Sequence, residues 1–273
     1  MTILPEMIPL QIGSCSAPGF AARRDGGFRS VRFPAGAALI RNTSLGTLLF
    51  DTGYGAAFFE TTESFPERLY RWTTPTRLLP QDTLPAQLAR LNARPDLVLL
   101  SHLHADHVCG LFDLAELPPV LTSREAWGDL QQTGRLKSLS AGCPAPLRRR
   151  LLSLTPQFIE DFPAIPSPLS AWLNSPCYDL AGDGSLLALP LPGHGTGQFG
   201  LLLPHTASGP EFLIADAAWS RAALRDQVLP PSAVIGRLGD AMIYSETFRS
   251  LCAISRKRPD LGLWPSHCPE AFS

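Results

Sequence analysis

The chain has 273 residues, of which 45% are hydrophobic and 17% are charged, and its formal net charge is −1 at pH 7. This composition suffices for a packed core, and the nearly neutral charge argues against nucleic acid as a partner. No apolar run approaches the roughly 18 residues of a membrane-spanning helix, and the N-terminal residues lack the pattern of a signal peptide. We therefore expect a cytoplasmic protein without a membrane partner, whose six scattered cysteines stay reduced.

Strands are the main elements expected in the first part of the chain. They span residues 29–41 and 47–51, and a glycine-rich turn at 51–55 ends the second of them. A short helix over 84–91 leads to a strand over 97–100. A further strand over 120–122 is followed by a helix that begins at Ser123, a residue type favoured at helix N-caps.

The stretch 124–175 contains several leucines, many prolines and an arginine run at 148–150, which is typical of the solvated side of an amphipathic helix. Strands are expected again over 185–191, 200–203, 211–214 and 261–264, with a helix over about 240–256. Two β-rich halves, each with helices, indicate an α/β protein built as a four-layer αββα sandwich. We expect a single domain over 1–273, with a helical insertion at about 124–175.

Histidines gather in one short window of the chain. The segment 101–107 reads SHLHADH and directly follows the apolar strand expected over 97–100. In an extended segment, side chains two residues apart point to the same side, so His102 and His104 can bind one cation. Asp106 and His107 follow after the chain turns and are directed to a second position. Three more candidate ligands come at expected strand ends or in the loops after them: His194, Asp216 and His267.

These residue types together predict a metal site. Three imidazoles form a suitable zinc set with an open fourth position, and a second ion needs a bridging carboxylate, for which Asp216 is the candidate. We expect two zinc ions per chain, although manganese, iron or cobalt can replace zinc among histidine and aspartate ligands. His205 lies in an expected surface turn and is not assigned to the site. Cys109 and Cys268 are interpreted as buried apolar residues, although each is next to a candidate ligand.

The chain resembles the metallo-β-lactamase superfamily, whose motif HxHxDH is followed by a distant His, an Asp and a final His. The resemblance spans about residues 30–267 and implies the metallo-β-lactamase fold. It also implies that Asp106 steers a proton to the leaving group and that Asp51 supports the metal-binding loop from behind the ligands. The ligand sets that it implies are His102, His104 and His194 for the first ion, Asp106, His107 and His267 for the second, and Asp216 as the bridge.

The resemblance further implies a dinuclear metal-dependent hydrolase in which a hydroxide held between the metals attacks a carboxylic ester. The intervals from His194 to Asp216 and from Asp216 to His267 are similar to those of the N-acyl-homoserine lactonase and glyoxalase II branches. A lactone of the acyl-homoserine type is therefore the expected small-molecule substrate. A thioesterase acting on a glutathione or acyl-CoA thioester and a low-turnover ligand-binding regulatory homologue stay open as alternatives, with a phosphodiester substrate as a weaker one.

The departures from the lactonase pattern concern the substrate pocket. Those lactonases often carry a Tyr three residues after the bridging Asp, where this chain has Trp219. Tyr244 is a candidate to supply the missing hydroxyl, and Phe199 and Trp219 are candidates to line an apolar acyl pocket. The long interval from His107 to His194 indicates that the stretch 124–175 forms either a lid beside the site or the surface of a homodimer.

Overall fold

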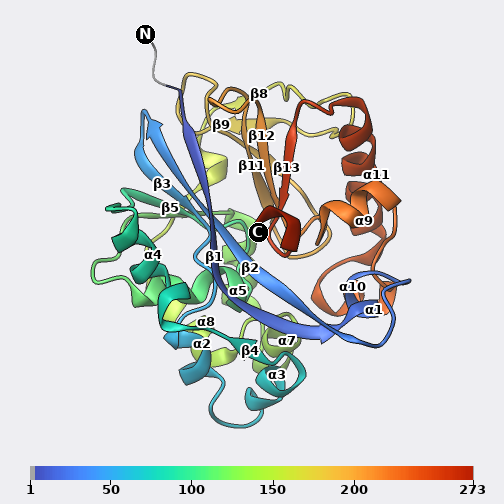
Figure 1. Ribbon diagram of the computed structural model, residues 1–273. Coiled ribbons are helices and arrows are strands. Elements are labelled where there is room, and N and C mark those ends of the chain that lie inside the picture. The colour runs from blue at the N-terminus through green and yellow to red at the C-terminus, as the bar shows by residue number, and fades with distance from the viewer. Residues whose placement is uncertain (1–3, 273) are drawn as a thin grey trace.

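The computed structural model describes residues 4–272, and its strands form two sheets (Figure 1). The first sheet has the strand order β4-β1-β2-β3-β5-β6-β7. β1 and β2 pair antiparallel over nearly their whole lengths, whereas β3, β5, β6 and β7 run parallel. The strands span Glu6–Pro18 (β1), Ser30–Thr43 (β2), Gly46–Phe50 (β3), Thr76–Arg77 (β4), Leu97–Leu99 (β5), Val120–Thr122 (β6) and Gln157–Phe158 (β7).

The second sheet is built from the C-terminal half of the chain, in the order β13-β12-β11-β10-β9-β8. Its neighbouring strands are antiparallel, except for the parallel pair β12 and β13. The strands span Ala164–Ile165 (β8), Cys177–Asp179 (β9), Leu187–Pro190 (β10), Phe199–Leu203 (β11), Glu211–Ala215 (β12) and Gly262–Pro265 (β13).

Successive residues of the central strands point to opposite faces of their sheet, as a pleated strand requires. In β2, Leu39 packs in the core on the helix-covered side, whereas Ile40 packs between the two sheets. In β12, Ile214 packs under the helices of the second sheet, and Leu213 faces the first sheet. The sheets are therefore apolar on both faces, which explains why the strands read as nearly continuous apolar runs.

Helices cover the outer face of each sheet. α2, α4, α5, α6 and α8 contribute buried side chains to the core of the first sheet, and α9, α10 and α11 do so for the second. The layers are thus helices, sheet, sheet and helices, which confirms the expected four-layer αββα sandwich. The helices of the first half span Gly19–Ala22 (α1), Ala56–Thr61 (α2), Arg68–Thr73 (α3), Leu84–Arg90 (α4), Ala105–Val108 (α5), Arg124–Gln132 (α6), Arg135–Ser140 (α7) and Ala145–Leu151 (α8).

The helices of the second half span Arg221–Asp226 (α9), Ser232–Leu238 (α10) and Ala241–Lys257 (α11). Asp240 caps α11 by accepting hydrogen bonds from the backbone N–H groups of Met242 and Ile243. Short 3₁₀ helices lie at Pro80–Asp82 (η1), Cys109–Asp113 (η2), Ile159–Asp161 (η3) and Pro269–Ala271 (η4). Within residues 4–272, no helix has the length and apolar character needed to cross a membrane.

The strands and helices expected from the sequence lie within a few residues of their predicted bounds, but the sequence does not predict several other elements, including the long strand β1. Pro9 and the small polar residues around Cys15 weaken its strand pattern, and its pairing with the whole of β2 holds it in place. In the stretch 124–175, residues up to 151 form α6, α7 and α8. The remainder adds the edge strands β7 and β8, one to each sheet.

Candidate metal centre

The histidine-rich segment lies at the carboxyl end of β5, in the middle of the first sheet. β5 ends at Leu99, and the chain then passes through His102 and His104 before α5 begins at Ala105. His102 and His107 are fully buried, and His104 is 8% exposed. The short helix α5 begins directly after the extended segment and carries Asp106 and His107, and the ring centroid of His107 lies 4.0 Å from that of His102.

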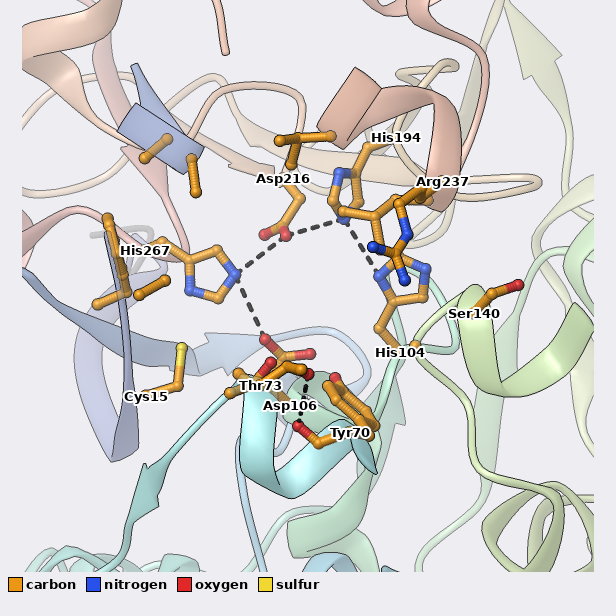
Figure 2. A pocket seen from close by; sticks show the side chains of 18 of the residues that line it. Cys15, Tyr70, Thr73, His104, Asp106, Ser140, His194, Asp216, Arg237 and His267 are labelled. Atoms are coloured by element: carbon orange, nitrogen blue, oxygen red, sulfur yellow. Dashed lines mark hydrogen bonds and ion pairs between the residues drawn. The ribbon is translucent and has the colours of Figure 1, made fainter. Parts of the chain in front are cut away.

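The remaining three candidate ligands come from the second sheet. His194 lies between β10 and β11, Asp216 follows β12, and His267 follows β13. Ala215 has a φ of +47°, a left-handed conformation that is rare for alanine and marks the sharp turn at the end of β12. Figure 2 shows Asp216, His194 and His267 pointing toward one another, with His104 and Asp106 opposite them.

Three imidazoles form one compact group. The ligand atoms of His102, His104 and His194 lie within 4.8 Å of one another. His194 Nε2 is 3.1 Å from His104 Nδ1, and burial lowers the pKa of both His102 and His104 well below the usual value. At neutral pH each of these two rings is therefore uncharged and has one nitrogen with a free lone pair.

A second group contains Asp106, His107 and His267, whose ligand atoms also lie within 4.8 Å of one another. Asp216 lies between the two groups. Its Oδ2 atom is 3.0 Å from both His194 Nε2 and His267 Nε2, and its Oδ1 atom is 3.3 Å from His107 Nε2. One carboxylate thus contacts imidazoles of both groups, which is the position that a bridging ligand requires.

Hydrogen bonds on the outer side of the site orient the imidazole rings. Asp51 accepts a hydrogen bond from Ser101 Oγ at 2.7 Å, so Ser101 Oγ can in turn accept one from His102 Nδ1 at 3.0 Å. His107 Nδ1 donates to Asp51 at 2.8 Å, and His267 Nδ1 donates to the carbonyl of Pro34 at 2.7 Å. In a neutral ring this leaves each Nε2 atom as a lone-pair donor that faces the centre.

The residues fit a bound divalent cation. Buried polar atoms at the centre have no hydrogen-bond partner among the described residues: His102 Nε2, His107 Nε2 and Asp216 Oδ1. Unsatisfied buried groups are destabilising by roughly 1–3 kcal/mol each, so their convergence needs a compensating partner. Bound cations would accept these lone pairs, and a set of imidazole and carboxylate ligands suits zinc and neighbouring transition metals.

Without a cation, the carboxylates control the protonation of the second group. Burial alone lowers the pKa of His267, but Asp216 and then Asp106 raise it to about 9. Burial also lowers the pKa of His107, but Asp216 and Asp51 raise it well above its usual value. Protons therefore compete with a metal for these two histidines.

The site opens into a cavity of about 800 Å³ with largely apolar walls. His104, Asp106, His194, Asp216 and His267 lie on its lining. The wall residues come from elements that are distant in the sequence, and they include Ala17 in β1, Phe33 in β2, Leu69 in α3, Leu136 in α7, Val234 in α10 and Trp219 after β12. Such a cavity can enclose an apolar chain next to the metal-binding residues.

Two of the residues expected in the pocket lie elsewhere. Phe199 is buried between the sheets, where its ring centroid is 5.8 Å from that of Tyr178, because it shares a strand face with Leu201 and Leu203. Tyr244, in α11, is 1% exposed and stacks against Phe248, and its ring centroid lies 6.4 Å from that of His194. Neither side chain lines the cavity, so their assignment to the pocket is wrong. Trp219 does line it, and its ring lies 5.7 Å from that of His194.

Several residues of the cavity lining are not predicted by the sequence, among them Cys15, Tyr70 and Arg237. They come from β1, α3 and α10, and no local motif singles them out. The ligand atoms of His102, His107 and Asp216 form a third group of the same kind, and none of the three groups contains a cysteine. All six cysteine thiols are free and buried. His205 is exposed after β11 and belongs to none of these groups.

Comparisons with known proteins identify the family and the fold. The model of the metallo-beta-lactamase superfamily matches residues 33–205, and no curated protein matches the chain. An N-acyl homoserine lactone hydrolase with N-hexanoyl-L-homoserine at its metal centre has a TM-score of 0.71 and 18% identity. This match covers 99% of this chain and 95% of that one.

Two further solved structures share the fold. One is a probable metal-dependent hydrolase from Staphylococcus aureus, with a TM-score of 0.66, 14% identity and coverage of 98% and 91%. The other is the dizinc quorum-quenching lactonase AidC, with a TM-score of 0.62, 14% identity and coverage of 98% and 89%. Because the superfamily model matches well over half of the chain and the fold is the same, the chain belongs to the metallo-beta-lactamase superfamily.

Proposed function

We propose that this metallo-hydrolase opens the ring of a lactone that carries an apolar acyl chain, of the acyl-homoserine lactone type. The observation that carries the proposal is the position of the metal-binding residues on the lining of a large cavity with apolar walls. The similarity in fold to lactone hydrolases supports the same substrate class. A neutral lactone ring suits the site, while the acyl chain occupies the apolar part of the cavity.

We further propose that the site holds two divalent cations, most simply zinc. His102, His104 and His194 would hold the first, and Asp106, His107 and His267 the second, with Asp216 shared between them. The unpaired buried atoms and the contacts of Asp216 with both groups support this assignment. When bound, the two cations supply an activated water and polarise the ester carbonyl.

The residues of the chain perform the other parts of the reaction. Asp51 and Pro34 hold the rings of His107 and His267 in fixed orientations. Asp106 is 13% exposed in its side chain and lines the cavity, so its carboxylate can carry a proton from the attacking water to the leaving oxygen. The apolar walls exclude bulk water from the acyl chain and strengthen the electrostatic interactions near the reacting bond.

A chain-length series tests this proposal. Each methylene buried in the cavity contributes about 0.8 kcal/mol to binding, so KM should fall up to about fourfold per added methylene until the cavity is full. Proton release by the zinc-loaded protein is measured on N-acyl-homoserine lactones of increasing length, with Asp106→Asn as the blank. Absence of turnover across the series, with both metals shown to be bound, would rule out the lactonase.

Hydrolysis of a thioester is the second candidate, and Arg237 favours it. Arg237 lines the cavity, and Figure 2 shows its side chain reaching from α10 toward His104 and His194. Within residues 4–272 it forms no ion pair and is the only arginine or lysine on the cavity lining. A guanidinium in this position can pair with a carboxylate of a leaving group such as glutathione. A higher kcat/KM for glutathione thioesters than for every lactone would support this candidate instead.

A further inference from the structure

The cavity holds few polar side chains that are free to contact a substrate. Trp219 lines it with its ring, but its indole N–H is enclosed and has no hydrogen-bond partner among residues 4–272. The hydroxyls of Thr73 and Ser140 donate to carbonyls of their own helices, at 3.0 Å to Leu69 and at 2.8 Å to Lys137. These groups are therefore unsuited to bind an oxygen of the reacting ester.

Tyr70 differs from them. It lies in α3 and lines the cavity, and its ring packs edge-on against Phe58 with 5.5 Å between centroids. That contact fixes the ring, while the hydroxyl makes no hydrogen bond to any residue that the structure describes. Figure 2 shows Tyr70 beside Asp106, and burial and then the Asp106 carboxylate raise the pKa of the Tyr70 hydroxyl well above its usual value. A phenol with a usual pKa of about 10 is a neutral hydrogen-bond donor at pH 7.

We propose that the Tyr70 hydroxyl donates a hydrogen bond to the leaving oxygen of the substrate ester, an inference that rests on the proposed lactone hydrolysis. In that reaction the acyl carbon gains a bond to the oxygen of water, and the ester C–O bond breaks with its electron pair on the leaving oxygen. Asp106 transfers to that oxygen the proton released by the water. Tyr70 keeps its own proton and stabilises the negative charge that develops on the oxygen before protonation.

The placement beside Asp106 selects the leaving oxygen rather than the carbonyl oxygen. Proton transfer from Asp106 requires the leaving oxygen to lie within hydrogen-bond reach of this carboxylate. Tyr70 is the aromatic hydroxyl on the same side of the cavity, whereas His194 and Arg237 lie on the opposite side (Figure 2). The Tyr70 hydroxyl, as hydrogen-bond donor, and the Asp106 carboxylate, as proton carrier, can thus both reach the leaving oxygen of the substrate.

Replacing that atom with sulfur provides the test. Sulfur is a weak hydrogen-bond acceptor, and a thiolate leaves readily without a donor. The variant Tyr70→Phe is compared with the wild type on an N-acyl-homoserine lactone and on the matching thiolactone, both with zinc-loaded protein. We expect kcat on the lactone to fall about 10- to 100-fold, as for a lost hydrogen bond to a charged group. On the thiolactone kcat should change little.

A binding measurement gives a readout that does not depend on turnover. Ring opening converts the leaving oxygen into the hydroxyl of N-hexanoyl-homoserine, and N-hexanoyl-2-aminobutyrate lacks that hydroxyl. Calorimetry should show that Tyr70→Phe weakens binding of the first compound by about 2- to 10-fold and leaves binding of the second unchanged. Zinc content is measured on every sample, and Tyr178→Phe serves as a matched control because Tyr178 packs at the core between the sheets.

Each outcome decides between the proposals. A larger loss on the lactone than on the thiolactone supports the role of Tyr70. Equal losses on both substrates, or no loss on either, overturn it while leaving lactone hydrolysis intact. A wild type that binds zinc but turns over neither substrate contradicts the proposed function, and the role of Tyr70 falls with it.

Discussion

Asp51 and His107 form a buried pair in which Asp51 Oδ2 accepts a hydrogen bond from His107 Nδ1 at 2.8 Å. Asp51 is fully buried, has a φ of +57°, and also accepts hydrogen bonds from the backbone N–H and the hydroxyl of Ser101. One carboxylate at the end of β3 therefore fixes both the loop after β5 and the ring of His107. In the proposed metal site, Asp51 would orient a ligand without being a ligand itself.

The variant Asp51→Asn tests this relationship. Asparagine tolerates a positive φ, so the backbone is retained, but the neutral amide no longer stabilises the ring orientation as a carboxylate does. We expect zinc affinity to fall about 10- to 100-fold at the His107 position while the fold persists. Competition with a chelator measures the affinity. Asp183→Asn, in a loop whose aspartate is exposed, should leave both zinc sites unchanged.

Stability of the metal-free protein should depend on pH through the same group of residues. The pKa of His267 is raised to about 9, and that of His107 is also raised, so both gain stability from protonation. The contribution of each is complete below the unfolded value of about 6.5, and that of His267 is lost as the pH rises through about 9. The Tm of the chelator-treated protein should fall between pH 7 and 9.5, whereas zinc-loaded protein, whose histidines are already deprotonated, should not show this fall. A rising Tm in the metal-free sample would contradict the expectation.

The sequence predicts the fold class and the candidate ligands because both depend on patterns within short segments of the chain. His102 and His104 lie two residues apart after an apolar strand, and the structure groups them with His194 as expected. The sequence of β11 also contains a local pattern that argues against Phe199 as a pocket residue. Alternation along the strand places Phe199 on the same face as Leu201 and Leu203, between the sheets.

The cavity could not be predicted in the same way. Tyr70 and Arg237 belong to short helices from opposite halves of the chain, and only the packing of the two halves brings them to one cavity. The strand β1 could not be predicted either, because its own strand pattern is weak and its pairing with the long neighbour β2 stabilises it. Long-range pairing and packing, rather than residue pattern, determine these features.

Gly142 packs against His104, and this contact should be sensitive to a single methyl group. Gly142 has a φ of +79°, and a Cβ atom there would lie 3.1 Å from His104 Cγ. Gly182 has a similar φ of +75°, but a Cβ atom added there would have no neighbour within 4 Å. Both Gly142→Ala and Gly182→Ala should lower the free energy of unfolding by about 1 kcal/mol, because alanine disfavours a left-handed backbone. Only Gly142→Ala should also lower zinc affinity, measured by chelator competition, and equal affinities would show that His104 does not depend on this contact.

Two walls of the cavity are joined by an ion pair between Glu67, which precedes α3, and Arg135 at the start of α7. Both carboxylate oxygens of Glu67 accept hydrogen bonds from Arg135 at 2.7 Å, and the Glu67 side chain is 2% exposed. Arg135→Gln leaves this carboxylate buried without its partner, so the Tm of the protein at pH 7 should be lower than that of the wild type. Because α3 and α7 both line the cavity, KM for long-chain lactones should rise as well.

The pH dependence of this effect identifies its cause. The hydrogen bond from Arg135 lowers the pKa of Glu67, so the stabilisation is present above the unfolded value of about 4.3 and is lost as the pH falls through the folded value. The difference in Tm between wild type and Arg135→Gln should therefore be largest at pH 7 and become smaller at acidic pH. Arg94→Gln is the matched control, because Arg94 and Glu116 form an exposed pair that contributes little to stability. Equal losses of Tm in the two variants would show that the link between α3 and α7 has no special role.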